Sequence, residues 1–193
     1  MKLHNTIPLR LLTAATLLAT ACTTPQKGDL LFHVTADRNA ITDVTPGMID
    51  HVAIVVAPDS VIEAVGRGVV VTPLDSLRCQ QGYYLIGRVK NANRQLSVDN
   101  ARKYLGRDYD WLYLPDNEAV YCSELVQLSF VDGNGQRLFA PIPMSFHDAT
   151  GKITSYWREF YEKKGMEVPE GKLGTNPGEM SRRACVSIKG KLR

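Results

Sequence analysis

The sequence predicts an α+β protein in which the strands of an antiparallel sheet come first and helices pack against them. Three observations support this class. After residue 28, short runs rich in valine and isoleucine alternate with turn residues, which is typical of strands. From about residue 98 onward, apolar residues recur at helical spacing instead. Cys122 stands at the start of one predicted helix and His51 opens a predicted strand, so only the fold can bring the two together.

The first 21 residues are predicted to be an export signal rather than part of the fold. Lys2 and Arg10 form a basic start, and a short apolar run with small residues at its end leads to Cys22. A membrane-spanning helix needs about 20 apolar residues, and this run is much shorter. The ending resembles the lipobox of bacterial lipoproteins, with Ala19 where leucine is usual, which implies lipid attachment at Cys22. The alternative is an ordinary signal peptide in which Cys22 has no role.

On this interpretation, residues 22–27 are a short tether to a membrane surface and residues 28–193 form one domain. The formal net charge of +3 falls to about +1 once residues 1–21 are removed, because they contain two basic residues and no acidic ones. No clustered basic face remains, so nucleic acid is not an expected partner. Cys79 and Cys185 either pair or remain buried free thiols, and Cys122 is unpaired in both cases.

The predicted strands form an antiparallel meander, with turn residues at 57–59 and 66–68. The run at 51–56 is continuously apolar, as expected of a buried strand. The five predicted strands cover residues 28–34, 51–56, 61–65, 69–72 and 83–89.

Three helices are predicted after the strands. Ser97 is predicted to cap a helix over 98–105 that Gly106 ends. The next helix begins near residue 121 and ends before residue 133. Its predicted buried stripe is Leu125, Val126, Leu128 and Phe130, with Glu124 and Gln127 facing outward.

The last predicted helix covers about 155–164, carries Tyr156 and Phe160, and ends in two lysines that suit the negative end of its dipole. The glycine- and proline-containing segment 168–178 is either an ordered wrap or a loose arm, and the sequence does not distinguish these.

Cys122 is the candidate nucleophile. A thiol titrates at a pH of about 8.5 in isolation, and both a helix N-terminus and a neighbouring imidazolium favour the thiolate. Cys122 has the first by position and would have the second if His51 lies beside it. Free cysteines are often small core residues, which is the alternative role. The position at a helix start within the string Tyr-Cys-Ser-Glu-Leu favours the nucleophile.

His51 is the candidate base, and Glu63 is the residue predicted to orient it. If the strands at 51–56 and 61–65 are joined by a three-residue loop at 57–59, Glu63 becomes a same-face diagonal neighbour of His51, at about 7 Å. A loop with an even number of residues would place Glu63 on the other face. A buried carboxylate needs a partner, and His51 would supply one. Glu63 on an exposed edge and Asp50 as the orienting residue are the alternatives, and Asp50 ranks lower because adjacent strand residues point to opposite faces.

Taken together, His51, Glu63 in Val-Ile-Glu-Ala, the segment Leu-Gly-Arg-Asp-Tyr-Asp at 105–110 and the string at 121–125 occur in the order seen in a known family. The sequence resembles the YiiX/YebB-like circularly permuted papain-like amidases of the NlpC-type cysteine hydrolase superfamily. The resemblance implies a permuted papain-like (NlpC-like) fold, in which an antiparallel sheet or barrel packs against helices. It also implies Cys122 as nucleophile, His51 as general base and Glu63 as the orienting residue.

Aromatic residues near the nucleophile are candidates for substrate binding. Tyr109, Trp111 and Tyr121 are predicted to line a substrate groove together with Tyr113, and packing of the helix onto the sheet is an equally good account of them. His33 and His147 are predicted to be surface or loop residues without a role.

The sequence therefore predicts an exported, lipid-anchored cysteine hydrolase of the bacterial cell envelope. It carries no Gly-x-Ser-x-Gly string and no zinc motif, and no cofactor or metal is expected. Cell-wall peptide is the leading substrate, because of the predicted compartment and the family resemblance. A lipid or acyl amide is the second candidate, and a non-catalytic envelope lipoprotein that binds peptide or lipid is the alternative from another class.

Overall fold

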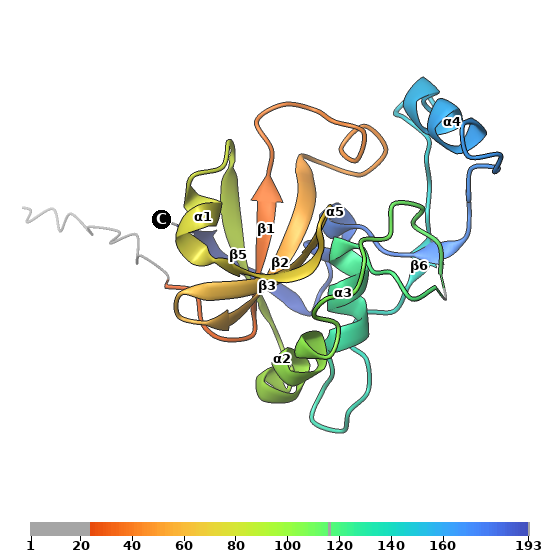
Figure 1. Ribbon diagram of the computed structural model, residues 1–193. Coiled ribbons are helices and arrows are strands. Elements are labelled where there is room, and N and C mark those ends of the chain that lie inside the picture. Colours follow the sequence, from red (N-terminus) through yellow and green to blue (C-terminus); the bar gives the residue numbers. More distant parts are fainter. Residues whose placement is uncertain (1–23, 116, 193) are drawn as a thin grey trace, which may run out of the picture.

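A computed structural model describes residues 24–115 and 117–192 of the chain. The predicted signal peptide and Cys22 lie outside these residues. The structure has the predicted α+β architecture, in which a curved antiparallel sheet is packed against helices (Figure 1). Within the described residues, no helix has the length and apolar character needed to cross a membrane.

The main sheet contains six strands in the order β4-β3-β2-β1-β5-β8, and all neighbours are antiparallel. The five predicted strands are confirmed, whereas β8 was not predicted because its lysines and glycine give it no apolar alternation. As an edge strand, β8 needs only one partner and tolerates this composition. The strands are β1 (Asp29–Val34), β2 (Ile49–Ala57), β3 (Ser60–Val65), β4 (Gly68–Pro73), β5 (Tyr83–Val89) and β8 (Val186–Lys191).

The hairpin between β2 and β3 reaches the predicted register by a different route. Ala57 pairs with Ser60, so the loop has two residues rather than the three that were predicted. A β-bulge at Val56 adds one residue to β2, and this compensates for the even-numbered loop. Glu63 therefore remains on the same face of the sheet as His51.

Two of the helix predictions need correction. Helix α2 (Arg94–Arg102) begins earlier than predicted, because Asn93 is its cap and accepts the Leu96 N–H at 3.1 Å. Ser97 is therefore not a cap but a buried residue within the helix. Helix α3 (Cys122–Ser129) is shorter than predicted, since Phe130 is already extended.

Of the predicted buried stripe, Leu125, Val126 and Phe130 are buried, whereas Leu128 is only partly buried. Gln127 is only 8% exposed, so the prediction that it faces outward is wrong. The reason is that α3 packs against β2 and β3 and also contacts α2 and α5 (Pro177–Met180), which leaves little of its surface free. Helix α1 (Leu74–Arg78), which was not predicted, follows β4 directly.

The core has three parts. Helices α2 and α3 cover one face of the sheet, and α1 packs with residues of the other face. Helix α4 (Ser155–Glu162) stands apart from the sheet, on the opposite side of the molecule from α1 (Figure 1). It buries Trp157 and Tyr161 in a separate aromatic cluster with Met144 and Phe146. This aromatic cluster lies next to the start of α3 and forms part of the site described below.

The segment 168–178 is an ordered wrap rather than a loose arm. Strand β7 (Leu173–Gly174) pairs with β6 (Ile142–Pro143), and α5 follows it with Asn176 as its cap. The wrap lies against the N-terminus of α3 and completes the surroundings of Cys122.

The start of β1 is attached to β5 by a buried ion pair. Asp29 is fully buried and forms two hydrogen-bonded contacts with the Arg88 guanidinium, with N–O distances of 2.9 and 2.7 Å.

Candidate active site

Cys122 is the first residue of α3 and lies at a break in the backbone direction. Tyr121 before it is extended, with φ −97° and ψ 170°. The Glu124 carboxylate turns back and accepts the Tyr121 N–H at 3.3 Å, which stabilises the first turn. The first N–H groups of a helix have no partner within it, and its dipole is positive there. Cys122 therefore lies where a negative sulfur and an anionic oxygen are both stabilised.

His51 and Glu63 are in direct contact. His51 Nε2 lies 2.7 Å from Glu63 Oε2, and the side chains are 19% and 4% exposed. Burial opposes ionisation of Glu63, but hydrogen bonding and attraction to His51 outweigh it and hold the pKa of the Glu63 carboxyl below its usual value. The pair predicted from the strand register is therefore present, and Glu63 is a charged acceptor for the imidazole.

The same histidine also contacts Cys122. Burial disfavours protonation of His51, but hydrogen bonds to Cys122 and Glu63 and attraction to both raise the pKa of the His51 imidazole from 6.5 to about 10. Because Nε2 is directed at Glu63, Nδ1 is the ring nitrogen left for the thiol. The arrangement Glu63–His51–Cys122 can hold a thiolate–imidazolium pair, which is the reactive form of a cysteine nucleophile.

A second histidine–carboxylate pair lies beside the first. His33 Nδ1 is 2.6 Å from Asp50 Oδ1, and His33 Nε2 is 2.7 Å from the carbonyl oxygen of Gln81. Hydrogen bonding to Asp50, which outweighs burial, raises the pKa of the His33 imidazole. The prediction of a surface or loop position for His33 is wrong, because it is a partly buried residue of β1 directly opposite His51 on β2. His147, in contrast, lies in a loop as predicted.

Asp50 is occupied by partners other than His51, which is why Glu63 and not Asp50 contacts His51. In addition to His33, Asp50 accepts the Asn39 side-chain amide at 2.6 Å. The side-chain Oδ1 of Asn39 accepts the N–H groups of Ile41 and Thr42 at 3.0 and 3.1 Å. These bonds attach the loop between β1 and β2 to the start of β2. The sequence signal for this network, the string Asn-Ala-Ile-Thr at 39–42, is too common to be recognised without the fold.

The tyrosine-rich loop after α2 is organised by Asp110, whose role sequence reasoning missed. The buried Asp110 carboxylate accepts the N–H groups of Leu112 and Leu114, both at 2.8 Å. Tyr113 has a positive φ of 51°, a conformation uncommon for a residue other than glycine. Burial raises the pKa of Tyr113 to about 12 and that of Tyr109 higher still, and the charge of Cys122 contributes to both.

The three residues predicted to bind substrate occupy different environments. Trp111 is 54% exposed and packs edge-on against Tyr109, with ring centroids 4.9 Å apart. Tyr109 is partly buried beside Cys122. Tyr121 is only 3% exposed, and its hydroxyl accepts the Thr175 N–H at 2.9 Å. Tyr121 thus connects the start of α3 to the wrap, while its ring lines a cavity.

Two cavities meet at these residues. The first contains Cys122, has an empty volume of about 520 Å³ including space open to solvent, and is lined mainly by apolar side chains. The second contains His51 and Glu63 and has an empty volume of about 1020 Å³, measured in the same way. Ile41, Asp50, Tyr113 and Trp157 line both cavities, so the two cavities adjoin along common walls.

The other described cysteines do not form a disulfide. Cys79 and Cys185 are both free, and the possibility of a bridge between them is not realised. Cys79 is exposed rather than buried, and burial raises the pKa of the partly buried Cys185 thiol.

Comparisons with known proteins agree with this architecture. A family model described as "Permuted papain-like amidase enzyme, YaeF/YiiX, C92 family" matches residues 24–183. The uncharacterized protein YiiX of Escherichia coli strain K12 is 30% identical over 125 residues, which cover 59% of this chain and 61% of that protein. A crystal structure of yiiX from Escherichia coli O157:H7 superposes with a TM-score of 0.72 and 23% identity, over 86% of this chain and 97% of that one.

The yiiX crystal structure is described as that of a metalloprotein. Between residues 24 and 192, leaving out residue 116, no group of three or more His, Cys, Asp or Glu side chains is arranged to hold a metal ion. The described side chains therefore do not fit a metal site of that kind.

Proposed function

The chain belongs to the permuted papain-like amidases of the YaeF/YiiX, C92 family, and on this premise we propose that it is a cysteine amidase that uses Cys122, His51 and Glu63. The observation that carries the proposal is the contact of His51 with both Glu63, at 2.7 Å, and Cys122 at the start of α3. A buried cysteine in a purely structural role does not need an imidazole held in place by a buried carboxylate.

The first half of the reaction transfers the acyl group to sulfur. The Cys122 thiolate attacks the amide carbonyl carbon and a C–S bond forms. The carbonyl oxygen becomes anionic and accepts the Cys122 N–H, which as an early helix N–H is available to it. The C–N bond then breaks, and His51 transfers its proton to the departing amine. This leaves a neutral imidazole and a thioester.

The second half returns the enzyme to its starting state. Neutral His51 takes a proton from water, and the resulting hydroxide attacks the thioester carbonyl. The C–S bond breaks, the carboxylic acid leaves, and the thiolate–imidazolium pair is restored. Glu63 holds the ring in position throughout and stabilises its charged form, as the third member of a catalytic triad does.

We place this activity in the bacterial cell envelope, because residues 1–22 read as an export signal followed by a lipidated cysteine. That compartment favours cell-wall peptide as the substrate. A second candidate, an amide with an apolar acyl group, is favoured by the lining of the cavity beside Cys122. The alternative of a silent binding protein on the same fold requires an unreactive Cys122.

Thiol reactivity separates the enzyme from the silent binder. The purified protein is treated with iodoacetamide at pH 6–7, and alkylation of each cysteine is followed by peptide mass spectrometry. We expect Cys122 to react at least about 10-fold faster than Cys79, an exposed thiol in the same chain. We also expect His51→Ala to remove this difference and leave the Cys79 rate unchanged. Equal rates for the two cysteines in the unmodified protein would support the silent binder.

A further inference from the structure

The proposed lipid at Cys22 lies only a few residues before the folded domain. The described chain begins at Thr24, and both Gln26 and Lys27 are already held by hydrogen bonds. An extended chain spans at most about 3.6 Å per residue, so the Cα atoms of Cys22 and Gln26 are within about 14 Å of each other. A lipid attached at Cys22 therefore brings the surroundings of Gln26 to the membrane surface.

These surroundings are the first turn of α2. Gln26 Oε1 accepts an N–H of the Arg94 guanidinium at 3.0 Å, and the Lys27 ammonium donates to Gln95 Oε1 at 2.5 Å. A Cβ atom on Gly28 would lie 2.8 Å from Arg94 Cβ, so the chain passes directly against the helix with no room for a side chain. The segment next to the anchor and α2 therefore form one continuous surface.

The outer side of α2 is basic and also exposes a leucine. Ser97, Val98 and Ala101 are the buried residues of the helix. At a period of 3.6 residues, the opposite side carries five partly or fully exposed side chains: Gln95, Leu96, Asp99, Arg102 and Lys103. We call these five residues, together with Lys27 and Arg94, the α2 face. The fold creates this face, since Lys27 and its partner Gln95 are 68 positions apart in the chain.

The charge of the α2 face suits an anionic phospholipid surface. Its four basic side chains outnumber the carboxylate of Asp99, which already pairs with Arg102 at 3.1 Å. A lysine or arginine near such a surface strengthens binding by about fivefold. Leu96, which is 37% exposed, and the apolar stems of Arg102 and Lys103 suit the boundary between headgroups and acyl chains. Because the anchor keeps the face close to the membrane, a modest attraction is enough to hold it there.

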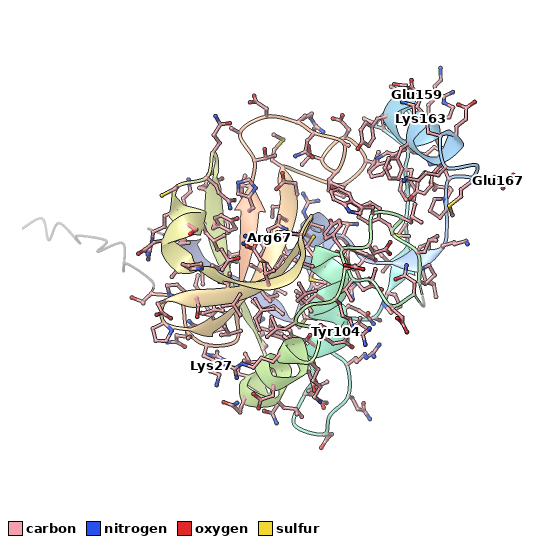
Figure 2. All side chains as sticks on the ribbon, in the orientation of Figure 1. Lys27, Arg67, Tyr104, Glu159, Lys163 and Glu167 are labelled. Carbon is pink, nitrogen blue, oxygen red and sulfur yellow. The ribbon has the colours of Figure 1, made fainter. Side chains whose placement is uncertain are left out.

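The α2 face and the candidate active site lie at opposite ends of β1. The strand begins at Asp29, directly after the residues that contact α2, and four residues later His33 lies opposite His51. At about 3.3 Å per residue, these two places are about 13 Å apart along the strand. Helix α4 is further away, because Figure 2 shows Lys27 beside α2 and Lys163 at the other end of the molecule. A membrane in contact with the α2 face therefore leaves the site on the aqueous side.

From these observations we propose that the α2 face docks on an anionic phospholipid surface and holds the candidate active site away from it. The inference rests on the lipid attachment at Cys22 proposed above. It also specifies the side from which substrates arrive. A site directed away from the bilayer takes its substrates from the surrounding envelope, such as cell-wall peptides, rather than amides embedded in the same membrane.

The test places an added tryptophan at either end of the molecule and determines which one contacts the bilayer. Leu96→Trp lies on the α2 face, and Tyr156→Trp is the matched control on α4, where Tyr156 is 53% exposed. The purified lipidated proteins are reconstituted into vesicles of phosphatidylcholine and phosphatidylglycerol, with and without brominated acyl chains, which quench only tryptophans at the bilayer. After subtraction of the emission of the unmodified protein, we expect Leu96→Trp to be quenched at least about threefold more than the control.

The charge of the lipid partner is tested by paired substitutions in the Leu96→Trp protein. Arg102→Glu with Lys103→Glu should lower the quenching to that of the α4 control, because the face then repels an anionic surface. Lys163→Glu with Lys164→Glu makes the same change in net charge on α4 and should leave the quenching unchanged. Vesicles of phosphatidylcholine alone make the same comparison without any substitution and should also give the lower quenching.

Each failure has its own signature. If the protein is anchored but the two added tryptophans are quenched equally, or the one on α4 more strongly, the docking proposal is wrong and the lipid attachment stands. Quenching of Leu96→Trp that is unchanged by the charge reversal and by phosphatidylcholine alone would overturn the anionic partner. If the N-terminal peptide carries no lipid by mass spectrometry and the protein does not float with vesicles, the attachment and the docking are both wrong. The amidase proposal is judged separately, by the reactivity of Cys122.

Discussion

At the scale of single residues, the site depends on two histidine–carboxylate pairs that lie side by side on neighbouring strands. His51 contacts Glu63 and Cys122, while His33 opposite it contacts Asp50. Each carboxylate is partly or fully buried and gains a charged partner, which offsets the cost of burial. The Glu63 carboxylate on β3 therefore fixes His51 in position. The Asp50 carboxylate, next to His51 in the chain, fixes the loop after β1 through Asn39.

Replacing Glu63 with glutamine tests its orienting role. Glu63→Gln keeps the size of the side chain but removes the charge that favours protonated His51. We expect kcat/KM on an acyl p-nitroanilide substrate to fall about 100-fold or more, while KM changes little. Glu167→Gln is the control, because Figure 2 shows Glu167 beside α4, well away from the hairpin that carries Arg67 and follows Glu63. Activity of Glu63→Gln within twofold of the unmodified protein would contradict the role.

The protonation of His51 can be measured directly. We expect the His51 ring signals in an NMR titration to remain those of imidazolium until the pH approaches about 10. Cys122→Ser should move this titration to lower pH, since one of the two raising contacts is lost, whereas Cys79→Ser should not. A raised pKa in the folded state also means that protonated His51 stabilises the protein fully below pH 6.5 and that this contribution is lost as the pH rises through about 10. Titration of His51 near pH 6.5 would exclude a thiolate–imidazolium pair.

At the scale of elements, the start of α3 is held between the sheet and the C-terminal wrap. The Tyr121 hydroxyl accepts the Thr175 N–H, and the Thr175 hydroxyl donates to Ser123 Oγ at 3.0 Å. Ser123 and Tyr121 flank Cys122, so both neighbours of the proposed nucleophile are attached to β7 and its continuation. The wrap thereby limits the movement of the helix start relative to His51.

The contribution of the hydrogen bond between the Thr175 N–H and the Tyr121 hydroxyl to the stability of the protein can be measured. Tyr121→Phe leaves the buried Thr175 N–H without its acceptor, which we expect to lower the free energy of unfolding by about 1–3 kcal/mol in urea denaturation. Tyr156→Phe removes the same hydroxyl from a side chain that is 53% exposed and should change stability by less than about 0.5 kcal/mol. Equal effects of the two substitutions would show that the wrap is not anchored through this bond.

At the scale of the whole molecule, the sheet, its two helices and the α4 unit meet at a single site. The sheet contributes His51, α3 contributes Cys122, and the aromatic cluster around α4 closes the cavity beside the thiol. Figure 1 shows that α4 and the segments leading to it stand away from the sheet, so their contribution is to the walls of the cavity. Trp157 of α4 lines the cavity of Cys122 and that of His51, so α4 contributes walls to both sides of the site.

Membrane attachment is also a property of the whole chain, and it is tested at Cys22. We expect the unmodified protein to partition into the detergent phase of a bacterial extract and to incorporate a labelled fatty acid. Cys22→Ser should abolish both, because the acyl chains are the only predicted anchor. Cys79→Ser, which alters an exposed thiol of the folded domain, should leave both unchanged. Fatty-acid labelling that survives in Cys22→Ser would place the lipid elsewhere.

The sequence by itself determined the fold class, five strands of the main sheet, and the two residues proposed as nucleophile and base. These were accessible because strand periodicity and the start of an apolar helix are local signals. The cap of α2 and the outer face of α3 were predicted wrongly, since Asn93 competes locally with Ser97 and the burial of Gln127 depends on neighbours distant in the chain.

Only the tertiary structure decided how the site is assembled. The register that brings Glu63 to His51 depends on a bulge at Val56 that compensates for a short loop, and no local pattern announces it. The pairing of His33 with Asp50 and the apolar cavity beside Cys122 likewise arise from segments far apart in the chain. Contacts of this kind are set by long-range packing, because they exist only after sheet, helix and wrap have come together.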